Sequence, residues 1–335
     1  MTMALLWLQL GGVTIIILLA SHFLAKSADI IAFKTGLGQS LIGVVLLATA
    51  TSLPELGTGV SSITLFDAPD LAAGDAFGSN LFNLLIIGLL DLYWRKGPIL
   101  TVVGPTASLV GILGIGVIGL AASAIVIHDL TATTSTWPIS PVSFLIILMF
   151  LTALFLIYRS EQQQGDVEEE GNEHGDATGL GAVAMFVVAA AVIVTAAIFL
   201  AQTGDTITEE MGWDASFVGT QFLAFSTSLP ELATAFAAIR LNAPSLAISN
   251  VLGSNLFNMG FVLFADDVAF TDGPLWASVA PIHLLTAIIA IIMTAVVLVS
   301  LSDRSRSRPS RFWTIESVAL IGLYATASVL VFRLG

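Results

Sequence analysis

The sequence TSLPEL occupies residues 51–56 and recurs, letter for letter, at residues 227–232. A second hexapeptide, GSNLFN, occupies residues 78–83 and recurs at residues 253–258. The copies are 176 and 175 residues apart, so the two motifs keep nearly the same spacing in each half of the chain. Shared apolar composition would explain similar helices, but not identical Pro, Glu, Ser and Asn positions. The chain is therefore predicted to contain an internal repeat.

The composition is that of a membrane protein. Of the 335 residues, 56% are hydrophobic and 10% are charged, and the mean hydropathy is +0.95. Soluble domains carry roughly 25% charged residues, so this chain lacks the polar surface that a water-soluble globule needs. The chain contains no cysteine, which excludes disulfides and thiolate metal sites.

Apolar segments separated by charged residues, Pro or Gly predict ten spans, since about 20 apolar residues cross a bilayer. The segments are 4–33, 39–65, 69–93, 98–127, 138–158, 178–203, 214–240, 243–266, 274–301 and 312–333. No basic region precedes the first segment, so we expect a retained span rather than a signal peptide. Residues 159–177, RSEQQQGDVEEEGNEHGDA, form an acidic linker between residues 1–158 and residues 178–335, which hold five spans each.

Each motif lies five spans from its copy, and an odd number of spans reverses the direction of the chain through the bilayer. The predicted fold is therefore an all-α membrane protein of ten transmembrane helices, built as two inverted-topology five-helix repeats. In such architectures the substrate binds near the midplane, where interrupted helices of the two repeats meet.

The basic residues predict the orientation. Ten of the eleven lie on or beside connections that follow odd-numbered spans, and only Arg333 falls on the other side. Because cytoplasmic loops carry an excess of Lys and Arg, we expect a multi-pass protein of the plasma membrane with its N-terminus outside and the acidic linker in the cytoplasm. The opposite side either concentrates cations or merely has polar loops; its acidic residues are Asp67, Asp70, Asp129, Asp205, Glu209, Glu210, Asp214, Asp266, Asp267 and Asp272.

TSLPEL combines the features of an ion site. Ser52 and Glu55 are three residues apart and share one helical face. Pro54 has no amide hydrogen and its ring crowds the carbonyl of Ala50, so we expect a kink that turns the carbonyls of residues 48–51 toward a cavity. Hydroxyl, carboxylate and carbonyl oxygens are the ligands that sodium and calcium prefer. The second copy supplies the same groups from Thr227, Ser228, Pro230 and Glu231.

Glu55 and Glu231 are the most informative residues. An ionised side chain at the bilayer centre costs from about 3 to more than 10 kcal/mol, so an intramembrane Glu indicates function. No Arg or Lys lies deep in any predicted span, which argues against structural ion pairs. GSNLFN supplies a facing wall, because each Ser and the Asn four residues later share one face. Gly78 and Gly253 permit close helix packing, which is also a common structural use of small residues in membranes.

These motifs resemble the paired α-repeats of the cation/calcium antiporter superfamily, in particular its prokaryotic sodium/calcium exchanger branch. The resemblance covers the whole ten-span plan. It implies alternating access, with spans 1 and 6 sliding over the other eight, and exchange of several sodium ions for one calcium. The side chains that it implies as ligands are those of Ser52, Glu55, Ser79, Asn83, Ser228, Glu231, Ser254 and Asn258, and the carbonyls are those of Ala48, Thr51, Ala224 and Thr227.

Three positions refine this expectation. Proton-coupled relatives carry Glu at Gly78 and Gly253, and potassium-dependent relatives carry Asp at Asn258, so we expect electrogenic, potassium-independent sodium/calcium exchange. Some prokaryotic sodium exchangers also carry Asp at the position of Asn258, so selectivity and stoichiometry stay open. The family's Gly-Asn pair is Gly74-Asp75 in the first half, and Asp75 is either a third carboxylate on the pathway or, as we favour, a helix cap.

Two other functions are considered. One is a calcium/proton or other divalent cation antiporter. The other is a membrane enzyme, which would need a nucleophile–base pair or a His-based metal motif. The histidines His22, His128, His174 and His283 show no metal-ligand spacing, and we expect them at interfaces or in loops. We therefore predict no enzymatic activity and no prosthetic group, with Na+ and Ca2+ as substrates, the lipid bilayer as surroundings, and neither nucleic acid nor an obligate protein as partner.

Overall fold

The structure is a computed structural model, and it describes residues 3–35, 49–94, 96–131, 138–163, 179–302 and 314–335. The described residues form helices and no strand. The long helices are α1 (Met3–Thr35), α3 (Leu53–Phe66), α4 (Pro69–Tyr93), α5 (Pro105–Thr131), α6 (Pro141–Gln163), α7 (Gly179–Met211), α10 (Leu229–Arg240), α11 (Pro244–Phe257), α13 (Ile282–Ser302) and α14 (Ile315–Leu334). Shorter elements are η2 (Ile99–Val102), α8 (Ala215–Val218), η3 (Gly219–Leu223), α9 (Ala224–Thr227), η4 (Asn258–Val262), α12 (Leu263–Ala269) and η5 (Leu275–Ala277).

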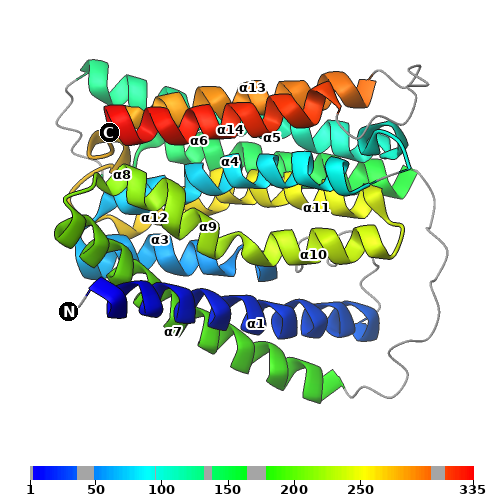
Figure 1. Cartoon of the computed structure of the whole chain (residues 1–335), viewed down its shortest axis with the longest axis horizontal. Helices are drawn as coiled ribbons and strands as arrows, with labels where there is room; N and C mark the ends of the chain where they lie inside the picture. Colours follow the sequence, from blue (N-terminus) through cyan, green and yellow to red (C-terminus); the bar gives the residue numbers. More distant parts are fainter. Residues whose placement is uncertain (1–2, 36–48, 95, 132–137, 164–178, 303–313) are drawn as a thin grey trace.

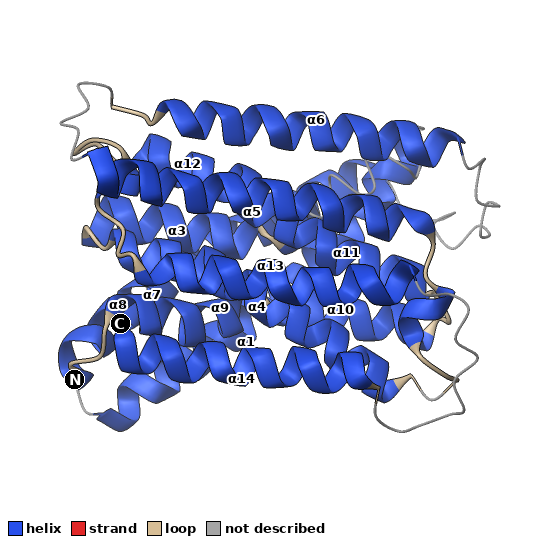
Figure 2. Cartoon of the chain, turned by 90° about the horizontal axis from the view of Figure 1, so that it is seen from above, coloured by secondary structure: helices blue, strands red, loops and turns tan. Residues whose placement is uncertain are grey.

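The predicted all-α membrane architecture is confirmed. Within the described ranges, eight helices are long and apolar enough to span a bilayer, and a ninth span results if the bent pair 215–227 and 229–240 is counted as one. The expected second span, 39–65, begins outside the described residues; its described part comprises the helical residues 49–51 and α3. The helices run roughly alongside one another (Figures 1 and 2).

Helices α4, α11 and α12 form the centre of the bundle, while α1 and α7 lie side by side at its edge (Figure 1). The α4 side chains Phe77, Leu81 and Leu84 are fully buried. The outer faces of α1 and α7 are apolar instead, with Leu8 71% and Leu180 83% exposed. An apolar surface of this kind suits contact with lipid rather than water.

Helices α1 and α7 are antiparallel. The Nε2 of Gln9, early in α1, donates a hydrogen bond to Oγ1 of Thr203, late in α7, at 3.0 Å. The indole of Trp7 also lies beside Trp213, with ring centroids 6.4 Å apart, and Trp213 contacts Phe332 near the end of α14. Both ends of the chain therefore lie at the same end of the bundle, as Figure 1 shows.

The helices break at the two TSLPEL motifs, as predicted from their prolines. Ser52 (φ −96°, ψ 10°) precedes α3, and Ser228 (φ −89°, ψ 4°) separates α9 from α10. The axis bends by 42° at Ser228. Proline is accommodated in the first turn of each following helix, where its missing N–H costs nothing. Each break starts a new helix whose first turn carries Glu55 or Glu231.

Two π-helical segments were not predicted. In η3, Gly219 packs so closely on α4 that a Cβ atom there would lie 2.5 Å from the carbonyl oxygen of Leu71. The second segment, η4, begins at Asn258, whereas the equivalent Asn83 lies in the uninterrupted helix α4. Such bulges often occur at functional sites, and no local sequence signal distinguishes them from ordinary helix.

Candidate functional site

The two glutamates of the TSLPEL motifs are buried in the middle of the bundle. Glu55 and Glu231 both have 0% exposure. Each sits in the first turn of its helix, α3 or α10, where unpaired backbone N–H groups and the helix dipole favour negative charge. The helix breaks at Ser52 and Ser228 create these two helix starts inside the protein. The local fold thus provides two buried positions that favour a carboxylate. Among the described residues, no buried Arg or Lys neutralises either carboxylate.

Each motif completes the surroundings of the other motif's glutamate. Oγ of Ser52 donates a hydrogen bond to Oε1 of Glu231 at 3.4 Å, and Oγ of Ser228 donates one to Oε1 of Glu55 at 3.2 Å. The threonine side chains follow the same arrangement, because Thr51 interacts electrostatically with Glu231 and Thr227 interacts electrostatically with Glu55. The two copies of TSLPEL, far apart in sequence, therefore form one polar cluster.

The GSNLFN motifs line the same cluster. Oγ of Ser254 donates to Oε1 of Glu231 at 3.3 Å, and Ser79 lies near Glu55 with its Oγ 3.3 Å from Oγ1 of Thr227. Asn83 and Asn258 are fully buried, and neither amide has a hydrogen-bond partner in the part of the chain that the structure describes. All eight predicted side chains are thus buried, and the hydroxyls of the four serines lie at the two glutamates or their neighbours.

The cluster offers oxygen atoms that other protein groups do not use. Oε2 of Glu55 and Oε2 of Glu231 have no hydrogen-bond partner among the described residues. The amide oxygens of Asn83 and Asn258 have none either, and each Asn follows by four residues a serine that lines the cluster. Buried polar atoms are normally hydrogen-bonded. A set of unpaired oxygen atoms therefore suits a bound cation that these oxygens coordinate. Among the described residues no group of three or more His, Cys, Asp or Glu has the arrangement of a metal site, so hydroxyl, amide and carbonyl oxygens must supplement the carboxylates.

The predicted backbone ligands are placed only in part. Ala48 lies outside the described residues, and Thr51 is fully buried. The carbonyl of Ala224 accepts a hydrogen bond from the Ser228 amide at 3.1 Å and lies 3.3 Å from Oγ1 of Thr227. The helix break at Ser228 therefore frees fewer carbonyls than predicted from the proline, because the Ala224 carbonyl still accepts a hydrogen bond in the last turn of α9.

Asp75 is not a helix cap, and the interpretation that we favoured from the sequence is wrong. The residue lies inside α4, which runs without interruption from Pro69 to Tyr93. Its carboxylate is 1% exposed, and Oδ1 accepts a hydrogen bond from Oγ1 of Thr227 at 3.0 Å. Asp75 also interacts electrostatically with Glu55. The sequence left open the alternative of a third carboxylate on the pathway, because Asp75 precedes Ser79 by one turn. The contacts of Asp75 with Thr227 and Glu55 are compatible with that alternative.

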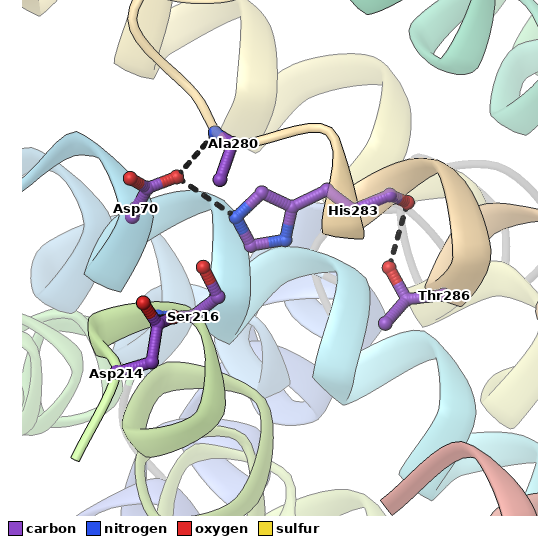
Figure 3. Close-up of polar contacts among 6 residues, drawn as sticks. All are labelled: Asp70, Asp214, Ser216, Ala280, His283 and Thr286. Carbon is purple, nitrogen blue, oxygen red and sulfur yellow. Dashed lines mark hydrogen bonds and ion pairs between the residues drawn. The ribbon is translucent and has the colours of Figure 1, made fainter. Parts of the chain in front are cut away.

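A second polar cluster lies nearer the end of the bundle that holds the two termini. His283, expected at an interface or in a loop, is fully buried and stacks on Phe77 with a centroid distance of 5.7 Å. Its Nε2 lies 3.1 Å from Oδ1 of Asp70, which also accepts the Ala280 amide at 2.6 Å (Figure 3). Asp70 thus joins the start of α4 to the start of α13.

Asp266 and Asp267 were expected among the water-facing acids, but both are fully buried in α12. Oδ1 of Asp267 accepts the Leu275 amide at 2.6 Å, and Oδ2 accepts the Ser140 amide at 2.8 Å. Asp91, late in α4, likewise accepts the Ile99 amide at 2.7 Å and hydrogen bonds from Thr314 and Ser317. Asp267 and Asp91 close chain turns, and hydropathy alone could not separate these buried residues from loop residues.

Comparison with known proteins agrees with this geometry. The family model described as "Sodium/calcium exchanger protein" matches residues 5–156 and again residues 181–333. The inner membrane protein YrbG of Escherichia coli K12 is 28% identical over 269 residues, covering 74% of this chain and 75% of YrbG. The sodium/calcium exchanger MaX1 of Methanosarcina acetivorans is 24% identical over 273 residues, covering 72% of this chain and 77% of MaX1.

Solved structures share the fold. A structure of the sodium-calcium exchanger NCX_Mj, soaked with Na+ and Sr2+, has a TM-score of 0.62 at 21% identity and covers 98% of this chain and 99% of its own. The structure of native YfkE has a TM-score of 0.64 at 17% identity, covering 97% and 92%, respectively. The family model covers nearly the whole chain, including both TSLPEL and both GSNLFN motifs. This membrane protein therefore belongs to the sodium/calcium exchanger family, a family of transporters.

Proposed function

We propose that the protein is a secondary active antiporter that exchanges Na+ for Ca2+ by alternating access, electrogenically and without K+. The observation that carries the proposal is the reciprocal contact of Ser52 with Glu231 and of Ser228 with Glu55. Through these contacts two carboxylates, one from each half, belong to a single buried cluster of carboxylate and hydroxyl oxygens. Such a cluster suits sodium and calcium, and the family membership supports the same substrates.

The proposed architecture is ten spans in two inverted repeats, residues 1–158 and 178–335, joined by the linker 159–177. Helices α1 and α7 support it, because each has 33 residues, their starts are 176 positions apart, and they run antiparallel. The family model also matches each half separately. Turn contacts repeat as well: Asp91 accepts the Ile99 amide as Asp267 accepts the Leu275 amide. An inverted repeat explains why equivalent residues meet at the centre.

The proposed ligands are those predicted from the motifs: Ser52, Glu55, Ser79, Asn83, Ser228, Glu231, Ser254 and Asn258 by side chains, and Ala48, Thr51, Ala224 and Thr227 by carbonyls. Their burial supports this assignment for the described members. With both glutamates ionised, their combined charge is about −2, which one Ca2+ or two Na+ would neutralise. The unloaded site would keep unpaired carboxylates in a low-dielectric interior, which is costly. Reorientation of the loaded site only would make the protein an exchanger rather than a channel.

Three sodium ions per calcium ion would move one net charge per cycle, worth about 2.3 kcal/mol per 100 mV. The alternative is calcium/proton or other divalent cation exchange. The packing around Gly78 disfavours the proton-coupled pattern, because a Cβ there would lie 2.5 Å from Cα of Thr220. A Glu side chain at this position would require the two helices to separate.

The proposed orientation has the N-terminus outside the plasma membrane and the acidic linker in the cytoplasm. At the end opposite the termini, Nζ of Lys96 donates to Oδ1 of Asn242 at 2.6 Å, which brings two basic connections together. At the end that holds the termini, Asp70 lies in the first turn of α4 and Asp214 caps the start of α8, which packs against α4. This separation of bases from acids agrees with the positive-inside rule.

Calcium uptake into vesicles containing the purified protein tests the proposal. Vesicles loaded with Na+ should accumulate Ca2+ when diluted into Na+-free medium, and an inside-negative potential should slow this uptake if three Na+ leave per Ca2+. Adding or removing K+ should change nothing. Uptake driven by a pH step without Na+ would instead establish the proton-coupled alternative, and uptake that ignores the potential would contradict the stoichiometry.

A further inference from the structure

Asp266 is a buried carboxylate outside the central cluster that performs no structural task among the described residues. It lies in α12 with 0% exposure, and neither Oδ1 nor Oδ2 has a hydrogen-bond partner there. Its neighbour Asp267, equally buried, has both oxygens occupied by backbone amides. An unpartnered buried carboxylate is costly, and inside a membrane it indicates function.

The Asp266 carboxylate points at one face of α3. A Cβ atom on Gly59 would lie 2.7 Å from Oδ1 and 2.8 Å from Oδ2, so only glycine leaves room for the carboxylate there. Ser62, three residues later, lies on the same face as Gly59. The Ser62 hydroxyl is fully buried and, like that of Thr58, has no partner in the described ranges. This face of α3 thus brings spare hydroxyl oxygens to the side on which Asp266 lies.

This place lies between the central cluster and the acidic end of the bundle. Glu55, Gly59 and Ser62 follow the spacing of one helical stripe, and Gly59 lies about 6 Å along the axis from Glu55 toward Phe66. The next helix begins there with Asp70 in its first turn. Asp75 interacts electrostatically with both Glu55 and Asp266, and its Oδ2 has no partner among described residues. Three carboxylates therefore form a series leading outward from the centre.

This series of carboxylates leads toward only one of the two ends of the bundle. Asp91 and Asp267 occupy equivalent positions of the two halves, because each accepts the backbone amide eight residues later. The position equivalent to Asp266 is therefore Leu90, which is apolar. In the same way Asp75 matches Asn250, which donates to Oγ1 of Thr234. The end of the bundle near Lys96 thus lacks both extra acids. A packing requirement common to both halves would not produce this difference, whereas attraction of cations from the acidic end would.

We propose that Asp266, with the Ser62 and Thr58 hydroxyls and the free oxygen of Asp75, forms an outer site for one sodium ion between the acidic end and the central cluster. The two Asp266 oxygens, the free Asp75 oxygen and the two hydroxyls amount to five oxygens. A calcium ion prefers six to eight, so this smaller set suits a single sodium ion. This inference rests on the proposed exchange, in which a sodium ion would bind the outer site before it reaches, or after it leaves, the central ligands.

Sodium binding to the full-length protein in nanodiscs tests this site apart from the central one. We compare the E55Q/E231Q variant with E55Q/E231Q/D266N and with the control E55Q/E231Q/D272N, in which an exposed acid at the same end is replaced. At constant pH, with choline replacing sodium, the double variant and the control should each bind one Na+ saturably, and E55Q/E231Q/D266N should bind none. Equal binding with and without D266N, or no saturable binding to the double variant because Asp266 only holds a proton, would overturn the proposal.

A second pair of variants keeps the central glutamates. Gly59→Ala should displace the Asp266 carboxylate without changing any charge, and Asp266→Asn should remove its charge. Both should raise the Na+ concentration that half-saturates Ca2+ efflux by about fivefold or more, within the usual range of coupling between sites. Calcium binding in Na+-free buffer should stay at the wild-type level. Unchanged sodium dependence in both variants would refute the outer site, and if the protein exchanged no ions at all, the binding measurement would still decide.

Discussion

Oγ of Ser52 donates a hydrogen bond to Oε1 of Glu231 across 179 positions of sequence, at 3.4 Å. The equivalent serine of the other half, Ser228, does the same for Glu55 at 3.2 Å. Neither half can therefore assemble its carboxylate site alone. Any movement that separates the halves also dismantles the surroundings of both glutamates, which couples the state of the site to the conformation of the whole bundle.

Glu55→Gln and Glu231→Gln should each abolish calcium uptake. Residues that merely support a metal ligand change affinity by about 10–100-fold, so loss of a ligand carboxylate should lower the initial rate at least about 100-fold. Uptake into Na+-loaded vesicles measures this. Glu210→Gln, at an exposed position on α7, is the matched control and should transport normally. Substantial uptake by either site variant would defeat the two-carboxylate model.

Ser52→Ala and Ser228→Ala should weaken calcium binding to a similar extent. Each serine contacts the glutamate of the opposite half, so each loss should cost roughly 10-fold to 100-fold in affinity. Because both serines serve one cluster, their effects should not add in the double variant. Titration calorimetry of the purified protein checks this, with Ser123→Ala, on the exposed face of α5, as control. A large effect of one serine and none of the other would argue against reciprocal roles.

Cross-links should show which helices move together. The chain has no native cysteine, so cysteine pairs can be introduced cleanly. If α1 and α7 slide as a unit, linking positions 9 and 203, which hydrogen-bond across these helices, should leave transport intact. Linking positions 14 and 226, where α1 contacts α9 through hydroxyls 2.8 Å apart, should block transport.

The reduced form of each cysteine pair provides its own control, and reduction should restore any transport lost on cross-linking. Transport that survives the link between positions 14 and 226, with complete cross-linking shown by gel mobility, would contradict sliding of α1 over the core. Loss of transport on linking positions 9 and 203 would show that α1 and α7 move separately.

Adjacent aspartates of α12 should differ in their effect on stability. Asp267→Asn replaces one of the two acceptor oxygens by an NH2 donor, so one of the two backbone amides that Asp267 binds loses its acceptor. A buried unsatisfied donor costs about 1–3 kcal/mol. Asp266→Asn removes no hydrogen bond of the described residues and should not destabilise the protein in sodium-free buffer. Thermal unfolding in detergent measures both. The reverse order of stabilities would show that the contacts of Asp267 are unimportant.

Gly78→Ala should destabilise the bundle. Its Cβ would lie 2.5 Å from Cα and 2.6 Å from the carbonyl oxygen of Thr220, and backbone on both sides leaves little freedom to adjust. Overpacking of this kind costs about 1–3 kcal/mol. Gly12→Ala, exposed on α1 with nothing within 4 Å, should be neutral or stabilising. An unchanged unfolding temperature of Gly78→Ala would mean that α4 and η3 can separate easily.

The sequence by itself determined the membrane class, the helix breaks and the candidate ligands. Proline chemistry is local, so Pro54 and Pro230 predict breaks wherever the helices pack. An acidic residue in a long apolar segment indicates function without knowledge of its neighbours, and the exact repetition of two motifs implies that the halves meet. None of these inferences required a contact distance.

Only the tertiary structure decided the roles of the remaining acids and of His283. Asp75, Asp266 and Asp267 stand in similar apolar surroundings in the sequence, yet one contacts Thr227, one has no partner among described residues and one closes a turn. The physical reason is that the role of a buried polar group depends on which donors reach it. Some of these donors come from segments more than a hundred residues away, such as Thr227 for Asp75 and Ser140 for Asp267. Hydropathy shows only that a charged residue is unusual in an apolar span. The groups that pack against that residue determine its role.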